Sequence, residues 1–214
     1  MKLLLLRCPL CAEPLAPDTP EAVVFECPAC QTAVSIDDTG LSTQTVQFVA
    51  PAPAEAEKVT DWLPFWLFEG QVHIDKRETQ GRARAAEVEH LWGEPRRLFV
   101  PAWTVDMHNA RDIGSTLVQR QPVFVPVERP STARMRTVTA TAVDARKMLE
   151  FIIITIEAQR DDWLRSIEFR MELGNPTLYA IPTEAQQGRW HLVAQIEAEL
   201  GEADNGLMAR LWPF

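Results

Sequence analysis

The chain has 214 residues, of which 46% are hydrophobic and 24% are charged, so it can form one or two folded domains and is neither disordered nor fibrous. Its 21 basic and 30 acidic residues give a net charge of −9, which argues against a protein that coats nucleic acid. No stretch approaches the roughly 20 apolar residues of a membrane-spanning helix, so we expect no membrane span.

The first residues resemble a secretory signal only superficially. The apolar run at 3–6 is closed by Arg7, whereas a signal peptide carries roughly 7–15 apolar residues before a cleavage site. We expect a short strand there instead, leading into the first cysteine pair. Paired cysteines without a leader are typical of a reducing compartment, and the sequence therefore predicts a cytoplasmic protein.

Four cysteines form two Cys-Pro-x-Cys pairs with fifteen residues between them: Cys8, Cys11, Cys27 and Cys30. A two-residue gap lets both thiolates of a pair bind one ion, and two pairs complete a tetrahedral site. This spacing is a strong signature of zinc, with iron as the second candidate because thiolates bind both. Four protein ligands close the site, so the expected Zn²⁺ is structural. A redox role is disfavoured, because neither pair opens an evident helix.

Residues 1–36 resemble the zinc-ribbon family in these CPxC knuckles and in the β-prone runs beside them. The resemblance implies a small β-sheet module held together by the four cysteines. Zinc ribbons and rubredoxins often place glycine after each knuckle, where this chain has Ala12 and Gln31, and this departure disfavours a rubredoxin-like iron site. Ribbons bind DNA, RNA and protein, but the net charge of 1–36 is −2, which favours a protein partner over nucleic acid.

The pattern predicts a zinc ribbon at 1–37, a linker with a short strand at 38–60, and a β-rich α+β body at 61–214. The linker is indicated by the Ala/Pro/Glu composition of 50–58. Four apolar runs of the body lead into a proline, which cannot donate to a sheet and so predicts short strands that stop or bend there. The expected fold class is α+β, mostly β. The runs LPFW, FVPAW and YAIP resemble those of uncharacterised bacterial zinc-ribbon proteins.

Within the body, residues 81–92 are either helical or a polar excursion between strands. Residues 149–157 (LEFIIITIE) fit a buried helix or a buried strand, and their β-branched side chains favour the strand, after a short helix at 143–148. Strict alternation predicts a strand at 166–173, and Gly174-Asn175-Pro176 predicts a hairpin turn into a strand at 177–181. A second turn is expected at 187–188 and a last helix at 195–200.

Other candidate sites have weaker support. The four histidines are scattered and favour surface or packing roles over a second metal site: His73, His90, His108 and His191. A hydrolase could be imagined from Asp106, His108, Asp112 and Ser115, but the GxSxG elbow is absent. The acidic pair Asp161-Asp162 and the acidic residues at 197–204 show no calcium-binding spacing, and solvated turns or helix ends explain them better.

Two windows are mildly basic, 76–97 with a net charge of +2 and 128–147 with +3, whereas 149–206 carries −7. On one shared face the basic windows could contact phosphates, although solvated strands and loops explain them better. The last residues, 211–214 (LWPF), are apolar, and we expect them to fold back onto the body rather than dock into a partner.

Three functional hypotheses remain. The leading one is a non-enzymatic zinc-binding interaction or scaffold protein, such as a subunit or assembly factor of a larger complex. The alternative is a nucleic-acid-associated zinc-ribbon protein. The third is an enzyme whose site is not visible in the sequence. Enzymatic activity therefore stays open, although the sequence favours a protein without it. Replacing Cys27 by serine is expected to release the metal and unfold 1–36 while the body stays folded.

Overall fold

The computed structural model of the chain describes residues 6–56, 59, 61–80, 91–160, 163–186, 189–192 and 196–202. Outside these residues lie the start of the first predicted strand, most of the 81–92 segment with His90, the Asp161-Asp162 pair, the turn residues 187–188 and the apolar end 211–214. Among the described helices, none is both long and apolar enough to cross a membrane.

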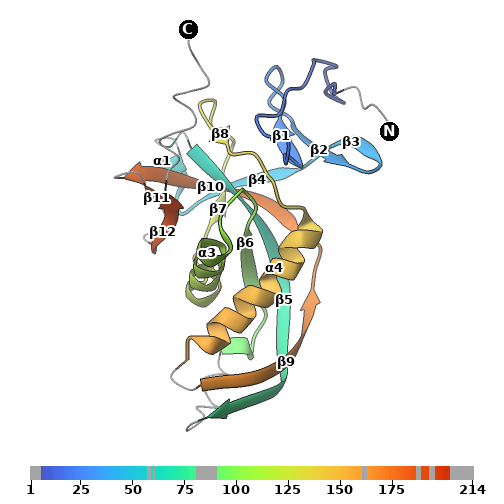
Figure 1. The fold of residues 1–214 in the computed structure, drawn as a ribbon. Helices are drawn as coiled ribbons and strands as arrows, with labels where there is room; N and C mark the ends of the chain where they lie inside the picture. The colour runs from blue at the N-terminus through green and yellow to red at the C-terminus, as the bar shows by residue number, and fades with distance from the viewer. Residues whose placement is uncertain are drawn as a thin grey trace.

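The fold is α+β and mostly β, as the sequence predicts. A small antiparallel sheet contains β1 (Val24–Glu26), β2 (Ala33–Asp37) and β3 (Gly40–Thr43), in that order. The remaining strands form a larger sheet, covered by two long helices. Figure 1 shows the small sheet near the N-terminus at one end of the molecule, with the larger sheet extending away from it.

The predicted linker at 38–60 contributes to both sheets. It contains β3 of the small sheet, β4 (Val46–Ala50) of the large sheet and the single-turn helix α1 (Pro53–Ala56). The division of the chain into ribbon, linker and body stays a prediction.

The strand β5 (Asp61–Gln80) is the spine of the large sheet. Its first part pairs with β10 (Thr177–Gln186) on one edge and with β6 (Arg96–Pro101) on the other, and its second part pairs with β9 (Trp163–Leu173). Because β9 and β10 are both antiparallel to β5, they run end to end along it. The strand predicted at 166–173 is therefore confirmed, but the hairpin predicted at 174–176 is wrong.

The connection between β9 and β10 stays close to β5, which explains why it does not reverse the chain. The backbone N–H of Gly174 donates to the carbonyl of Glu69 at 2.8 Å. Gly70 lies opposite Leu173, and a Cβ at Gly70 would come within 2.1 Å of the carbonyl oxygen of Glu172. A glycine at position 70 thus permits the close approach of β9 that a side chain would prevent.

The rest of the large sheet extends from β10. β4 pairs parallel with β10, and β7 (Val125–Pro126) pairs with β4. β11 (Arg189–Leu192) pairs antiparallel with β10, and β12 (Ile196–Glu202) pairs antiparallel with β11. Gln186 of β10 pairs with Arg189 of β11, and the residues of the predicted turn, 187–188, lie outside the described part of the chain. The helix predicted at 195–200 is wrong, because β12 alternates apolar and acidic residues with the period of a strand.

A short strand, β8 (Arg134–Met135), runs parallel to the start of β5. Of the four prolines that follow apolar runs, Pro101 and Pro126 end their strands as expected. Pro64 and Pro182 instead lie inside β5 and β10.

The helix α4 (Ala142–Ala158) contradicts the strand favoured for 149–157. The side chain of Thr141 caps its start by accepting a hydrogen bond from the backbone N–H of Asp144. Its buried side chains recur at helical spacing and pack into the main core: Ala145, Leu149, Ile152, Ile153 and Ile156. Burial against the sheet outweighs the intrinsic preference of isoleucine for strands, because packing contributes more than propensity.

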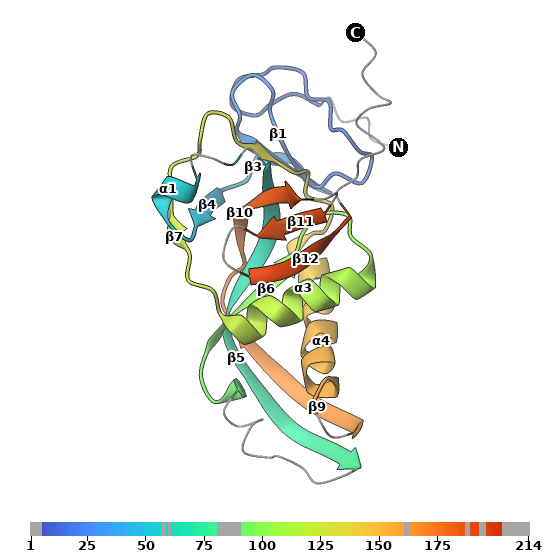
Figure 2. The same cartoon turned by 90° about the vertical axis from the view of Figure 1, so that its left-hand side faces the viewer.

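The second long helix, α3 (Met107–Arg120), lies beside α4 and against β6. Figure 2 shows both helices passing over the large sheet. The two helices meet at Gly114, where an added Cβ would come within 2.3 Å of the Cδ1 atom of Ile152.

Candidate metal centre

The two cysteine pairs lie on loops with the same backbone hydrogen bonds. In each loop the N–H of the first cysteine donates to a carbonyl five residues ahead, and the N–H of the residue four positions after it donates back to its carbonyl. The bonds measure 2.8–2.9 Å and involve Cys8 with Ala12 and Glu13, and Cys27 with Gln31 and Thr32. Such knuckles turn both thiols of a pair toward one point, as the spacing predicts.

Each knuckle closes on a left-handed residue that is not glycine. Ala12 has φ of 62° and Gln31 has φ of 58°. These are the two positions where zinc ribbons often have glycine. A side chain is disfavoured at such angles because Cβ crowds the following carbonyl, so both knuckles fold with local strain.

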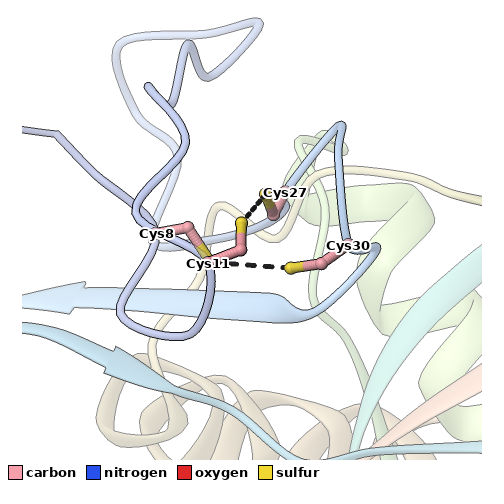
Figure 3. Close-up of side chains that lie close together, drawn as sticks. All are labelled: Cys8, Cys11, Cys27 and Cys30. Carbon is pink, nitrogen blue, oxygen red and sulfur yellow. Dashed lines mark hydrogen bonds between the residues drawn. The ribbon is translucent and has the colours of Figure 1, made fainter.

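The four sulfur atoms converge, and all of them lie within 4.8 Å of one another. The contacts drawn in Figure 3 join Cys8 to Cys30 and Cys11 to Cys27, each at 3.6 Å between Sγ atoms. This separation is far too long for a disulfide bond. It is close to the edge of about 3.8 Å that four sulfurs form around a zinc ion at about 2.3 Å. All four predicted ligands thus meet in one place and fit a tetrahedral metal site.

Two of the four thiols have pKa values that are shifted in opposite directions. Hydrogen bonds with the side chain and backbone of Thr32 lower the pKa of Cys30 to about 6. A backbone hydrogen bond with Glu13 lowers the pKa of Cys11, but lost hydration and the neighbouring thiols outweigh it and raise that pKa to about 12. A divalent cation bound here would lower the pKa of each cysteine that coordinates it, because the cation stabilises the thiolate.

A small core supports the cysteine cluster. Cys8 and Cys27 are buried, and they pack with Leu15, Phe25 and Val34. Cys11 is exposed, so the site opens toward solvent on the side of the first knuckle.

The second knuckle is fastened to the large sheet by Arg129. Its guanidinium donates to the carbonyl of Gln31 at 2.9 Å, forms an ion pair with Glu26 at 2.8 Å, and stands 5.4 Å over the ring of Phe48. Burial raises the pKa of Glu26, while Arg129 acts to lower it. Because Glu26 precedes Cys27 and Gln31 follows Cys30, one arginine holds both ends of this knuckle.

Backbone pairing also joins the two sheets. The backbone of Val24 in β1 forms an isolated bridge with Val138, and the N–H of Val23 donates to the carbonyl of Val138 at 2.8 Å. Val24 and Ala33 belong to the main core rather than to the small one. Through these contacts the two knuckles and the sheet β1–β3, here called the metal-binding unit, pack against the body.

A cleft of about 550 Å³ lies at this junction. Its lining is mostly amide, hydroxyl and apolar: Gln31, Thr32, Gln44, Thr45, Gln47, Phe48 and Val127 with the Glu26–Arg129 pair. The lining comes from three separate segments, 26–33, 44–48 and 126–129, so no local pattern of the sequence indicates it. These groups can donate and accept hydrogen bonds, but they include neither a nucleophile paired with a base nor a second metal cluster.

The residues of the imagined hydrolase have structural roles. The carboxylate of Asp106 caps α3 by accepting from the N–H groups of His108 and Asn109, and the hydroxyl of Ser115 donates to the carbonyl of Asp112. His108 contacts the exposed carboxylate of Asp112 one helical turn away at 3.4 Å. His73 is on β5 beside Glu172, and His191 is on β11.

Several arginines of the basic windows are engaged within the chain. Arg96 donates to the carbonyls of Leu91 and Val118, Arg97 donates to the carbonyl of Pro122, and Arg129 holds the knuckle. Arg82 and Arg84 lie outside the described residues. The exposed positive charge of the described part is therefore smaller than the sequence count suggests.

A buried carboxylate escaped the sequence analysis. Glu157, at the end of α4, is fully buried and accepts from Arg77 at 2.9 Å, from Trp92 Nε1 at 2.8 Å and from Arg160 at 3.0 Å. Each carboxylate oxygen is thus paired, and the group ties α4 to β5. The one signal in the sequence was its position, because Glu157 ends the apolar run 149–157.

No known protein family, curated protein or solved structure matches this chain significantly. The cysteine geometry is consistent with a zinc ribbon, and what the body does must be inferred from the chain itself.

Proposed function

We propose that the chain is a structural-zinc protein of the zinc-ribbon type that serves as a non-enzymatic interaction or scaffold component. The observation that carries the metal assignment is the convergence of four thiols from two matching knuckles. Four thiolates suit zinc, with iron second, and leave no coordination position for substrate or water. The ion would therefore hold the knuckles together and supply no reaction.

Two observations support an interaction role for the rest of the chain. The metal-binding unit is fastened to the body by Arg129 and by the pairing of Val24 with Val138, so it presents a fixed surface. The cleft at the junction lacks a catalytic group among its lining residues. Free thiols also suit a reducing compartment, which supports a cytoplasmic location.

The nucleic-acid alternative has less support, because Arg96, Arg97 and Arg129 are committed to contacts within the chain. Arg134 is exposed, and a joint change of Arg134→Ala and Arg136→Ala tests this alternative directly. Salt-dependent binding of DNA or RNA that this change weakens would favour the alternative over a protein partner.

The test of the proposal has two readouts. Elemental analysis of the purified chain should give one zinc per chain, and iron or no metal would refute the zinc assignment. Affinity purification from the native host should then give a protein partner that binds again when both components are pure. A turnover activity abolished by one polar substitution in the body would overturn the scaffold role.

A further inference from the structure

The strands β5 and β9 form an arm at the end of the molecule opposite the cysteine cluster. Figures 1 and 2 both show the two strands running side by side away from the small sheet. β9 pairs with β5 along its whole length, from Gly70–Leu173 to Gln80–Trp163. Within the described residues, nothing pairs with the other edge of β9. An edge strand of this length offers a row of unpaired backbone N–H and C=O groups to another strand.

The two faces of β9 differ sharply. Ile167, Phe169, Met171 and Leu173 share one face and are half-buried, and the last three pack against the main core. Ser166, Glu168, Arg170 and Glu172 share the other face and are exposed. A strand added to this edge must keep its apolar residues on the core side, so only registers that preserve this alternation are acceptable.

The sequence of β9 complements itself when two copies run antiparallel about a two-fold axis at Phe169. In that register Glu168 of each copy lies opposite Arg170 of the other, while Ile167 lies opposite Met171 and the two Phe169 rings face each other. Opposite charges and apolar pairs directly across an antiparallel ladder are stabilising. The ladder runs from Arg165 to Leu173, which is nearly the whole strand.

The neighbouring registers are worse. An axis at Glu168 places the two Glu168 carboxylates opposite each other, and an axis at Arg170 opposes the two Arg170 side chains and sets Glu168 against Glu172. Like charges directly across a ladder are destabilising. An axis at Met171 opposes Arg170 and Glu172, but its ladder covers only the last part of β9, from Phe169 to Leu173. The register about Phe169 therefore combines length with charge complementarity.

The charges of the arm also continue across this register. Glu168 lies opposite Lys76 of β5, and Arg170 bonds to Asp75 at 2.8 Å. In the dimer, Lys76 and Glu168 of one copy and Arg170 of the second copy would form a row of charges that alternate in sign. These ion pairs are exposed, so they select the register more than they add stability.

We propose that two copies of this chain associate through β9, which pairs antiparallel with β9 of the second copy about a two-fold axis at Phe169. The interface is isologous, and it joins the two arms into one sheet in the order β5, β9, β9, β5. This self-association is independent of the metal site.

Charge exchange tests the proposal. Light scattering of the purified wild-type chain should give twice the 24.2 kDa mass of one chain. Glu168→Arg alone and Arg170→Glu alone should each weaken the dimer by roughly tenfold to a hundredfold, because each opposes like charges twice. The double variant Glu168→Arg/Arg170→Glu should restore dimerisation, because it exchanges the partners without changing the register. Glu150→Arg, on the exposed surface of α4, is the control and should leave the dimer intact.

Crosslinking provides a second readout that does not depend on ion pairs. A zinc-loaded Glu168→Cys chain mixed with a zinc-loaded Arg170→Cys chain should form the mixed disulfide under mild oxidation, and more of it than either chain forms with itself. A monomeric wild-type chain at high micromolar concentration would overturn the proposal. Three other results would also overturn it. They are a dimer that both single charge variants leave unchanged, failure of the double variant to restore dimerisation, and the absence of the mixed disulfide.

Discussion

At the scale of single residues, the knuckles are formed by a backbone conformation that their own residues disfavour. Ala12 and Gln31 both adopt the left-handed conformation, where a Cβ costs about 1–2 kcal/mol. Both knuckles form nevertheless, because paired backbone hydrogen bonds fix each loop.

Ala12→Gly should therefore stabilise the metal-bound ribbon. The gain is expected to be roughly 0.5–1 kcal/mol, since glycine removes the left-handed strain but brings more disorder to the unfolded chain. Thermal unfolding of the zinc-loaded chain measures it. Ala33→Gly, in β2, is the control and should lower the unfolding temperature. If Ala12→Gly also lowers the unfolding temperature, the left-handed strain at position 12 is absent.

Asp106 gives the start of α3 a pH dependence. Hydrogen bonds from the N–H groups of Asn109 and His108 to the carboxylate lower the pKa of Asp106 below its usual 3.8. A lowered folded-state pKa contributes stability above pH 3.8 that is lost as the pH falls through the lower value. Asp106→Asn keeps a capping oxygen but does not titrate. The stability difference between wild type and this variant should shrink below about pH 4 in chemical denaturation, and a constant difference would contradict the assignment.

At the scale of elements, the contact of α3 with α4 depends on the missing side chain of Gly114. A Cβ there would meet Cδ1 of Ile152 at 2.3 Å and the carbonyl oxygen of Phe99 at 3.3 Å. Gly114→Ala should destabilise the fold by roughly 1–3 kcal/mol through overpacking. Adding Ile152→Val removes the Cδ1 atom and should recover part of the loss, as measured by denaturant unfolding of both variants. Equal destabilisation by the single and double variants would show that the helices do not meet at this point.

The elements also show where sequence reasoning succeeded and failed. The strand at 166–173 was predictable because its alternation is strict and one face is half-buried. The strand preference at 149–157 failed because residues on all sides of the segment are apolar, which hides the helical period. The hairpin at 174–176 failed because Gly-Asn-Pro marks an interruption, while only the pairing with β5 decides the direction that follows.

At the scale of the whole molecule, Arg129 couples the metal-binding unit to the body. Arg129→Ala should lower the stability of the zinc-loaded chain by roughly 1–3 kcal/mol, because it leaves the largely buried Glu26 and the carbonyl of Gln31 without their partner. Arg134→Ala, at an exposed position of β8, should have little effect. Denaturant unfolding measures the stability of both variants. Equal losses of stability would show that Arg129 does not stabilise the junction.

Removing the metal should affect both units. Cys27→Ser should lower the zinc content from one ion per chain to none and abolish hydrogen-exchange protection in β1–β3. The body should stay folded but unfold at a lower temperature, because Val24 and Ala33 pack in its core. Chelation of zinc from the wild-type chain should reproduce both effects. A body whose unfolding temperature is unchanged would show that the two units fold independently.

The sequence by itself determined the four-cysteine cluster and the predominance of β structure, because both depend on short-range patterns: two-residue gaps between cysteines, and alternation along a strand. The tertiary structure alone decided the rest. It placed β9 and β10 along one edge of β5, brought Arg129 to a knuckle about a hundred residues earlier in the chain, and buried Glu157 between two arginines. These features depend on which distant segments of the chain pack together and bury their apolar surface, and local sequence patterns do not specify that packing.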